Sequence, residues 1–225
     1  MQTAVIIGST GLIGSLLVEK LVQTGEFEQI IALYRGETPT SLYYKSPKVH
    51  LIRFDFQNWS ELELQIKAKL NGPSFFFCCL GSTIKKAKTK ENFKKVDLDA
   101  PVQFAQLSKD CSGEMLLVVS AAGADEHSQV FYNQTKGEME KSVRATFSNQ
   151  LHFFRPSLLL GDRKEFRIGE RLAVLAAPLY APFMFGKLKS FRPVKAASVV
   201  NAMYAVATRR LCFDEVVENF VLLRL

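Results

Sequence analysis

The chain has 225 residues, enough for one α/β domain with a full hydrophobic core. Its hydrophobic fraction of 48%, which includes 18 Phe, excludes an intrinsically disordered protein. The formal net charge of +7 favours anionic partners such as a phosphorylated cofactor. Much of the basic excess lies in residues 83–95 and 162–171, which lack the interleaved aromatic residues of a nucleic-acid platform. We therefore expect no nucleic-acid partner.

The cysteines favour a reduced protein inside the cell. Cys78, Cys79, Cys111 and Cys212 form no C-x-x-C pair and no cluster with metal-ligand spacing, so no metal site is expected. The first residues, MQTAVIIGSTG, lack the basic and cleavage regions of a secretory signal peptide. No apolar run reaches the roughly 18 residues needed to span a bilayer. These observations predict a cytoplasmic location.

Strand-like and helix-like segments alternate along the chain. The predicted order is strand 3–8, helix 15–25, strand 29–34, strand 49–56, helix 60–72, strand 74–81, helix 90–109, strand 115–121, helix 131–145, strand 151–156, helix 196–211 and strand 219–225. Strands separated by helices predict a doubly wound parallel sheet of the α/β class, the Rossmann fold. We expect a single NAD(P)-binding domain over residues 1–225. Residues 157–195, rich in Pro and Gly, would form a small irregular cap on the substrate side.

The stretch GSTGLIG, at the junction of the first strand and first helix, predicts a dinucleotide site. The first Gly allows a tight turn, the second lets backbone N–H groups approach a pyrophosphate, and the third lets the helix pack on the sheet. The alternative is a glycine turn with no ligand. The expected cofactor-binding residues here are Gly8, Ser9, Thr10, Gly11, Leu12, Ile13 and Gly14.

Arg35, which follows the second strand, favours NADP(H) over NAD(H). A guanidinium can pair with a 2′-phosphate, whereas NAD enzymes place an acidic residue at this point, and Glu37 nearby leaves that alternative open. Asp55 could bind the adenine or form a turn, and Phe56 beside it is a further expected cofactor contact.

Two later strand ends add to the expected cofactor site. Leu80 and Gly81, which close the fourth strand, are expected to lie under the cofactor. Arg155 ends the sixth strand and could contact the cofactor or form a structural ion pair.

Ser120, Tyr132 and Lys136 form a candidate proton-transfer group. Ser120 lies at the end of the fifth strand, and the other two are four residues apart, so they share a face of the next helix. A nearby ammonium favours the phenolate form of Tyr, and Ser can bind a substrate oxygen. Tyr132 and Lys136 could also hold the cofactor. Tyr-x-x-x-Lys alone is equally typical of a half-exposed helix face, so its interpretation depends on the glycine turn and on Ser120.

These motifs resemble the short-chain dehydrogenase/reductase superfamily. FFFCCLGSTIKKA, FKKVDLDAP, VVSAAGAD, FYNQTKGEMEKSV and FRPSLLLGDR are similar to its atypical, Tat-interacting-protein-like branch. The resemblance implies a Rossmann fold, NADP(H) binding and a Ser120, Tyr132, Lys136 triad. Val96 and Asp97 lie where extended members often carry a structural Asn, so this chain departs from the pattern there.

The expected function is an NADP(H)-dependent oxidoreductase acting on a small or medium carbonyl or alcohol substrate. One alternative is an NADP(H)-binding regulator or adaptor with little turnover, and a second is a nucleotide-sugar epimerase-like enzyme. The apolar segment 172–185, flanked by basic residues, could be a pocket wall or core, a homodimer contact, or a patch that touches a membrane surface. Of these three, the pocket wall or core is favoured and membrane contact is not expected.

Overall fold

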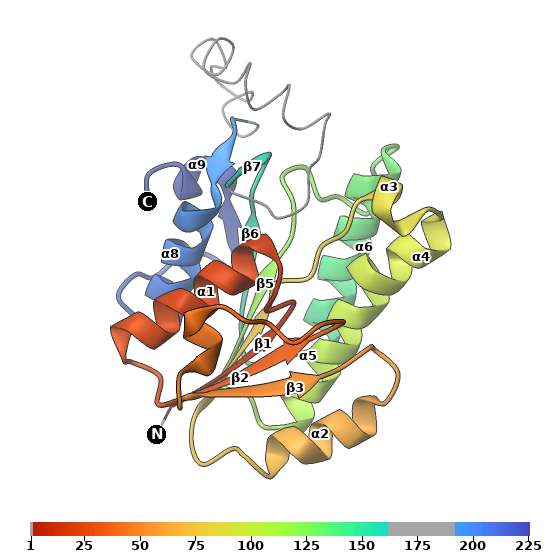
Figure 1. Cartoon of the computed structure of the whole chain (residues 1–225). Coiled ribbons are helices and arrows are strands. Elements are labelled where there is room, and N and C mark those ends of the chain that lie inside the picture. The colour runs from red at the N-terminus through yellow and green to blue at the C-terminus, as the bar shows by residue number, and fades with distance from the viewer. Residues whose placement is uncertain (1, 162–191) are drawn as a thin grey trace.

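The predicted doubly wound sheet is present in the computed structural model, which describes residues 2–161 and 192–225. Seven strands, all parallel, form one sheet in the order β3-β2-β1-β4-β5-β6-β9 (Figure 1). Their bounds are β1 Thr3–Ile7, β2 Gln29–Tyr34, β3 Val49–Arg53, β4 Ser74–Cys78, β5 Met115–Val119, β6 Gln150–Arg155 and β9 Val216–Glu218. Most of the predicted cap, and the apolar segment 172–185 in full, lie outside the described residues.

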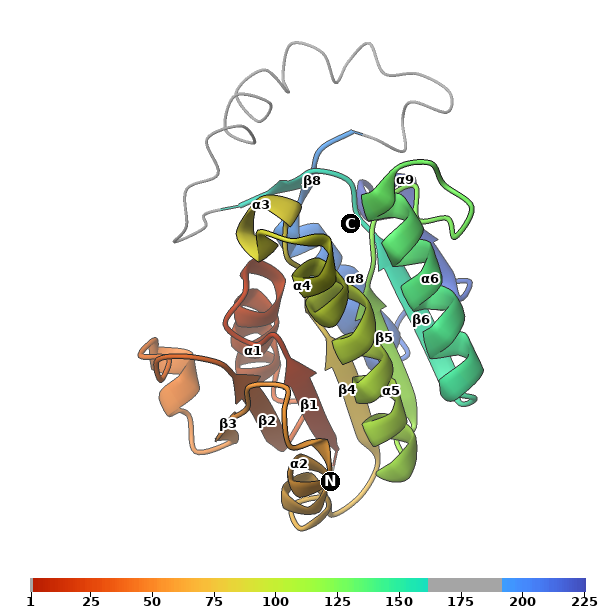
Figure 2. The same ribbon diagram turned by 90° about the vertical axis from the view of Figure 1, so that its right-hand side faces the viewer.

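Helices cover both faces of the sheet (Figure 2). One face carries α1 (Leu12–Thr24) and α8 (Ala196–Ala207), and the other carries α2 (Trp59–Lys67), α5 (Ala100–Asp110) and α6 (Phe131–Thr146). Among the described residues, no helix is both long and apolar enough to cross a membrane.

The central strand β4 shows why the sheet needs cover on both sides. All five of its residues are buried. Phe75 and Phe77 point to the α1 side, where both meet Phe27 edge-on, and Phe76 points the other way against Phe104 of α5. A strand buried on both faces is expected to be continuously apolar, which explains why the run SFFFC predicted a strand so clearly.

The chain order places a crevice at the carboxyl ends of β1 and β4. The connection from β1 runs to β2 on one side, while β4 leads to β5 on the other, so the strand order reverses between them. Ligands of doubly wound sheets bind at such a switch point. The glycine turn follows β1, residues 79–83 follow β4 and Ser120 follows β5, so the sheet edge brings these segments together.

The predicted strand at 219–225 is wrong. The strand is β9, which ends at Glu218, and residues Asn219–Leu222 form the short helix α9. The buried side chain of Asn219 accepts a hydrogen bond from the Ser157 backbone and donates one to the Arg192 carbonyl. These contacts hold the chain across the strand ends at Asn219. Strand β9 therefore stops at Glu218, and only its three residues pair with β6.

Other predicted bounds need correction. The third strand ends at Arg53 rather than 56, and Phe56 takes a left-handed backbone conformation with φ of 71° that ends an extended run. The predicted helix 90–109 consists of α4 (Lys90–Lys94), a π-helical turn (Lys95–Asp99) and α5. Not predicted were α3 (Ile84–Ala87), a 3-10 helix (Leu42–Lys45), and the small parallel pair β7 (Leu159–Leu160) and β8 (Val194–Lys195).

Candidate cofactor and proton-transfer site

The glycine turn after β1 is built for close backbone approach. Gly8 has φ of 76°, and its carbonyl accepts a hydrogen bond of 3.0 Å from the Gly11 N–H. Gly11 is the N-cap residue just before α1, and no side chain caps that helix end. The first N–H groups of α1 therefore lack intrahelical partners and can bind an anionic group such as a phosphate.

Gly14 has a packing role in the first turn of α1. A Cβ at this position would lie 2.1 Å from the Gly8 carbonyl oxygen and 2.8 Å from the Ser9 Cα, which are both backbone atoms. The absence of a side chain therefore lets α1 rest directly on the turn that precedes it.

We expect Gly14→Ala to lower the free energy of unfolding by about 1–3 kcal/mol, because the added methyl forces the turn and the helix apart. Urea denaturation of both proteins measures the change. Gly81→Ala is the matched control, because its Cβ would meet nothing closer than 4.0 Å. Equal stability of the two variants would contradict the packing role of Gly14.

A cavity of about 1160 Å³ opens over the glycine turn and the ends of β4 and β5. It is large enough to hold a dinucleotide. Of the residues predicted to bind cofactor or substrate, those that line it are Gly8, Thr10, Gly11, Leu12, Ile13, Arg35, Phe56, Leu80, Gly81, Ser120, Tyr132 and Lys136. Most of the predicted turn residues thus share one cavity with the predicted proton-transfer group.

Four predicted cofactor residues lie outside this cavity. Ser9 is fully buried, and its hydroxyl donates to the Leu33 carbonyl at 2.7 Å, so it ties the turn to β2. Gly14 lies behind the turn, as described above. Asp55 lines a neighbouring pocket, and Arg155 is engaged in ion pairs, as shown below.

Lys136 is held in a buried ion pair that sequence reasoning missed. Its ammonium lies 2.8 Å from Asp97 Oδ1, and the side chains of Lys136 and Asp97 are 2% and 0% exposed. Burial lowers the pKa of Lys136, but attraction to Asp97 and to Tyr132 outweighs it, so the pKa stands above its ordinary value. The only indication in the sequence was that Asp97 occupies the place of an expected structural Asn.

Ser120 also has an acidic partner that was not predicted. Its hydroxyl donates a hydrogen bond of 2.6 Å to Glu140 Oε1, and Glu140 is 1% exposed. Because a hydroxyl carries one proton, Ser120 in this arrangement presents lone pairs, and no donor, to the cavity. The expected role of Ser120 as a donor to a developing oxyanion requires that this bond first be released.

Arg155 forms the structural ion pair that was one of its two expected roles. Its Nε and Nη2 atoms donate to the two oxygens of Glu140 at 2.9 and 2.7 Å, and Nη1 donates to Glu218 at 3.0 Å. The hydrogen bond to Glu140 is the main cause that raises the pKa of Arg155. Ser120, Glu140, Arg155 and Glu218 therefore form one network across β5, α6, β6 and β9.

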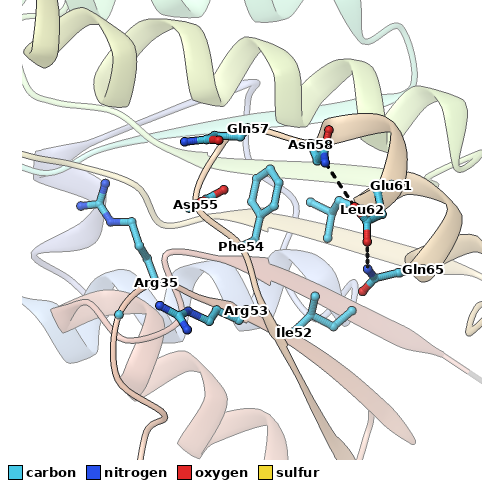
Figure 3. Close-up of a pocket in the computed structure, with 11 residues that line it drawn as sticks. Arg35, Ile52, Arg53, Phe54, Asp55, Gln57, Asn58, Glu61, Leu62 and Gln65 are labelled. Atoms are coloured by element: carbon cyan, nitrogen blue, oxygen red, sulfur yellow. Dashed lines mark hydrogen bonds between the residues drawn. The ribbon is translucent and has the colours of Figure 1, made fainter.

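A smaller pocket of about 340 Å³ adjoins the cavity at the ends of β2 and β3, and it is also lined by Arg35. Figure 3 shows Arg35 and Arg53 with their guanidinium groups toward the same side of this pocket, while Glu61, hydrogen-bonded to Asn58 and Gln65, lies on the opposite side. Arg53 was not predicted as a site residue. Its place next to Arg35 follows from strand register, in which Tyr34 pairs with Arg53.

The aromatic residues around Arg35 fix one wall of the cavity. Arg35 lies with its guanidinium carbon 5.3 Å from the centre of the Phe56 ring, and Phe56 stacks on Trp59 with 6.4 Å between ring centres. On the opposite side of the turn, the Tyr44 hydroxyl donates to the Ser9 carbonyl, and burial raises the pKa of Tyr44 to about 12. Tyr44 belongs to the unpredicted 3-10 helix, so its contact with the glycine turn was missed too.

Comparison with known families identifies relatives over most of the chain. A model of the NAD dependent epimerase/dehydratase family matches residues 4–161. The chain is 34% identical over 165 residues to Protein FMP52-2, mitochondrial, of Scheffersomyces stipitis, covering 73% of this chain and 69% of that protein. It is 30% identical over 172 residues to Protein HTATIP2 of Rattus norvegicus, covering 76% of this chain and 69% of that protein. These matches confirm the resemblance to the atypical short-chain dehydrogenases.

Solved structures share the fold. The structure of MoeE5 in complex with UDP-glucuronic acid and NAD superposes with a TM-score of 0.67 at 16% identity, over 96% of this chain and 74% of that one. The UDP-glucose 4-epimerase of Thermotoga maritima gives a TM-score of 0.65 at 15% identity, over 92% of this chain and 73% of that one. Identities this low support the Rossmann-like fold alone.

The expected cytoplasmic location is wrong. The relatives from Scheffersomyces stipitis, Candida albicans and Debaryomyces hansenii are all named mitochondrial, which points to mitochondria instead. Unpaired cysteines argue against an oxidising compartment, but they do not distinguish one reducing compartment from another. The cysteine pattern is therefore not sufficient to predict a cytoplasmic location.

Proposed function

The chain belongs to the NAD dependent epimerase/dehydratase family, and on that premise we propose that it is an NADP(H)-dependent oxidoreductase of the atypical short-chain dehydrogenase type. The proposed substrate is a small or medium carbonyl compound or alcohol. The observation that supports the proposal is that one cavity of about 1160 Å³ is lined both by the glycine turn and by Ser120, Tyr132 and Lys136.

The proposed chemistry divides between the cofactor and three side chains. Bound NADP(H) would supply or take up the hydride. Tyr132 would pass the proton to or from the substrate oxygen as general acid or base. Lys136, one helical turn along α6, would stabilise the phenolate and hold the cofactor ribose. Ser120 would orient the substrate oxygen by donating its hydroxyl proton to that oxygen once its hydrogen bond to Glu140 is released.

The preference for NADP(H) is proposed from two cations at one pocket. Arg35 and Arg53 are both exposed at the ends of adjacent strands, and neither forms an ion pair with another described residue. A 2′-phosphate between them would gain charge-assisted hydrogen bonds that a ribose hydroxyl cannot match. Glu37, the residue that would favour NAD, does not line this pocket.

We expect Arg35→Ala and Arg53→Ala each to weaken NADPH binding by about 10–100-fold, because each removes a hydrogen bond to a charged group. NADH affinity should change little in either variant. Quenching of Trp59, the single Trp of the chain, gives a binding readout, since Trp59 stacks on the cavity residue Phe56. Arg210→Ala is a matched control, because Arg210 is an exposed arginine that pairs with Glu26 on another part of the surface. Equal loss of NADPH and NADH affinity in the Arg35 and Arg53 variants would argue against a 2′-phosphate site.

The activity itself is tested with the native protein and a panel of aldehydes, ketones and alcohols, by following NADPH formation or loss. Turnover of at least one class supports the oxidoreductase. Tight NADPH binding without turnover across the panel would favour the regulator or adaptor. Turnover of a UDP-sugar with no net change in cofactor would favour the epimerase-like alternative.

A further inference from the structure

The ion pair between Asp97 and Lys136 adjoins the cavity that the proposed acid/base, Tyr132, also lines. Both side chains are almost fully buried, and 2.8 Å separates Asp97 Oδ1 from Lys136 Nζ. The other oxygen of Asp97 accepts a hydrogen bond of 2.8 Å from the Ser82 backbone N–H, so the carboxylate is fixed from two sides. Lys136 lines the cavity together with Tyr132, and Asp97 lies behind it.

The π-helical turn Lys95–Asp99 sets this position. The Ala100 N–H bonds to the Lys95 carbonyl five residues earlier, so the turn is wider than an α-helical turn. Asp97, in the middle of it, is the buried acidic residue of this turn and points toward α6.

Several other titratable groups of the described residues lie on the elements around Lys136. Cys78 on β4 is buried, and burial is the main cause that raises its pKa to about 11, so it is uncharged near neutral pH. Glu138 on α6 faces outward and pairs with Lys94 of α4 at 2.8 Å. Glu140, on the next turn of α6, is occupied by Ser120 and Arg155. Lys86 lies at the cavity wall on α3.

We propose that Asp97 is a positioning residue that offsets the charge of Lys136, and so keeps Tyr132 protonated to a higher pH than an unpaired lysine would allow. This inference rests on the proposed function. An isolated ammonium pulls the phenol toward phenolate, whereas an ammonium with a carboxylate on its far side presents little net charge. The resting enzyme therefore holds Tyr132 as an acid, the form that protonates a carbonyl oxygen during reduction.

The test is a titration of phenolate absorbance in the protein without cofactor, which requires no turnover. The signal of Tyr132 is obtained by subtracting the Tyr132→Phe titration from that of each protein. In Asp97→Asn we expect the midpoint of Tyr132 to fall by about 1–2 pH units. Asp97→Glu, which restores the charge, should bring the midpoint back toward the native value even where the longer side chain lowers stability.

A second pair of variants isolates the charge from the stability of the fold. Lys136→Met leaves Asp97 without its cation, and the double variant Asp97→Asn/Lys136→Met has no buried charge at all. The proposal expects the double variant to titrate near the native midpoint and Lys136→Met to titrate above both. This comparison holds even if Asp97→Asn alone folds poorly.

The opposite results would overturn the inference. If Asp97→Asn folds but Tyr132 titrates where it does in the native protein, Asp97 is structural only. Asp97 is also structural only if, in Asp97→Asn, Lys136 loses its proton before Tyr132 does and no phenolate forms below the native midpoint. Failure to find a substrate would count against the proposed function only. The absorbance titrations do not need a substrate, so they would still test the role of Asp97.

Discussion

Tyr132→Phe is expected to lower kcat for carbonyl reduction by about 10²–10⁴-fold, the typical contribution of a general acid. The substitution removes one oxygen and keeps the ring, which packs against Phe93 with 5.7 Å between ring centres. Neither the sheet nor the glycine turn should be disturbed, so NADPH affinity should stay within about twofold, a change of less than 0.5 kcal/mol. Steady-state kinetics and Trp59 quenching measure the two quantities separately.

The control for this substitution is Tyr204→Phe. Tyr204 is a buried tyrosine on α8, a helix that does not contribute to the cavity lining. Loss of the same oxygen there should leave both kcat and NADPH affinity near native. If Tyr132→Phe retained native turnover, the proton would have to come from another group, and the proposed mechanism would be wrong.

Glu140→Ala is expected to lower the free energy of unfolding by about 3–5 kcal/mol, because it removes the bidentate partner of a partly buried cation and the acceptor of a buried hydroxyl. Arg155, 20% exposed, would keep only Glu218, and the Ser120 hydroxyl would lose its acceptor. The hydrogen bond to Glu140 raises the pKa of Arg155, so this cation stays charged at every pH below its unfolded pKa. The decrease in the free energy of unfolding caused by Glu140→Ala should therefore be the same at every pH near neutrality. Urea denaturation at two pH values measures it.

Glu215→Ala provides the comparison for a surface ion pair. Glu215 is 48% exposed and pairs with Arg144, whose side chain is 39% exposed. Exposed pairs contribute about 0–1 kcal/mol, so this variant should be near native. A loss for Glu140→Ala no larger than that for Glu215→Ala would mean that the network around Ser120 does not stabilise the fold.

Periodicity and turn residues were sufficient to predict six of the seven strands of the sheet. Strand β2 coincides with the predicted 29–34, and α6 with the predicted 131–145 to within one residue, because each has a continuous or amphipathic apolar pattern with clear ends. The glycine turn was also predictable, since Gly8 has a positive φ and Gly14 a close backbone contact that other residues do not tolerate.

The charged partners within the site could not be predicted in the same way. Asp97 meets Lys136, and Glu140 meets Arg155, across 39 and 15 positions of chain, and no local pattern records which charges will face each other after folding. A buried ion pair depends on packing of whole helices, whereas strand and helix propensities are local. The end of the chain failed for a related reason, since Asn219 is held by residues far away in sequence.

In the π-helical turn Lys95–Asp99, the number of residues matters as much as their types, because it sets the direction in which Asp97 points. Shortening residues 95–99 by one position would let α4 and α5 join as a single regular helix, with better backbone geometry. Every side chain on one side of the deletion would then rotate by about 100° relative to those on the other side. The carboxylate would no longer meet the ammonium of α6, although no functional side chain had been replaced. A search for distant relatives of this protein should therefore weigh gaps in this segment as heavily as substitutions in the triad.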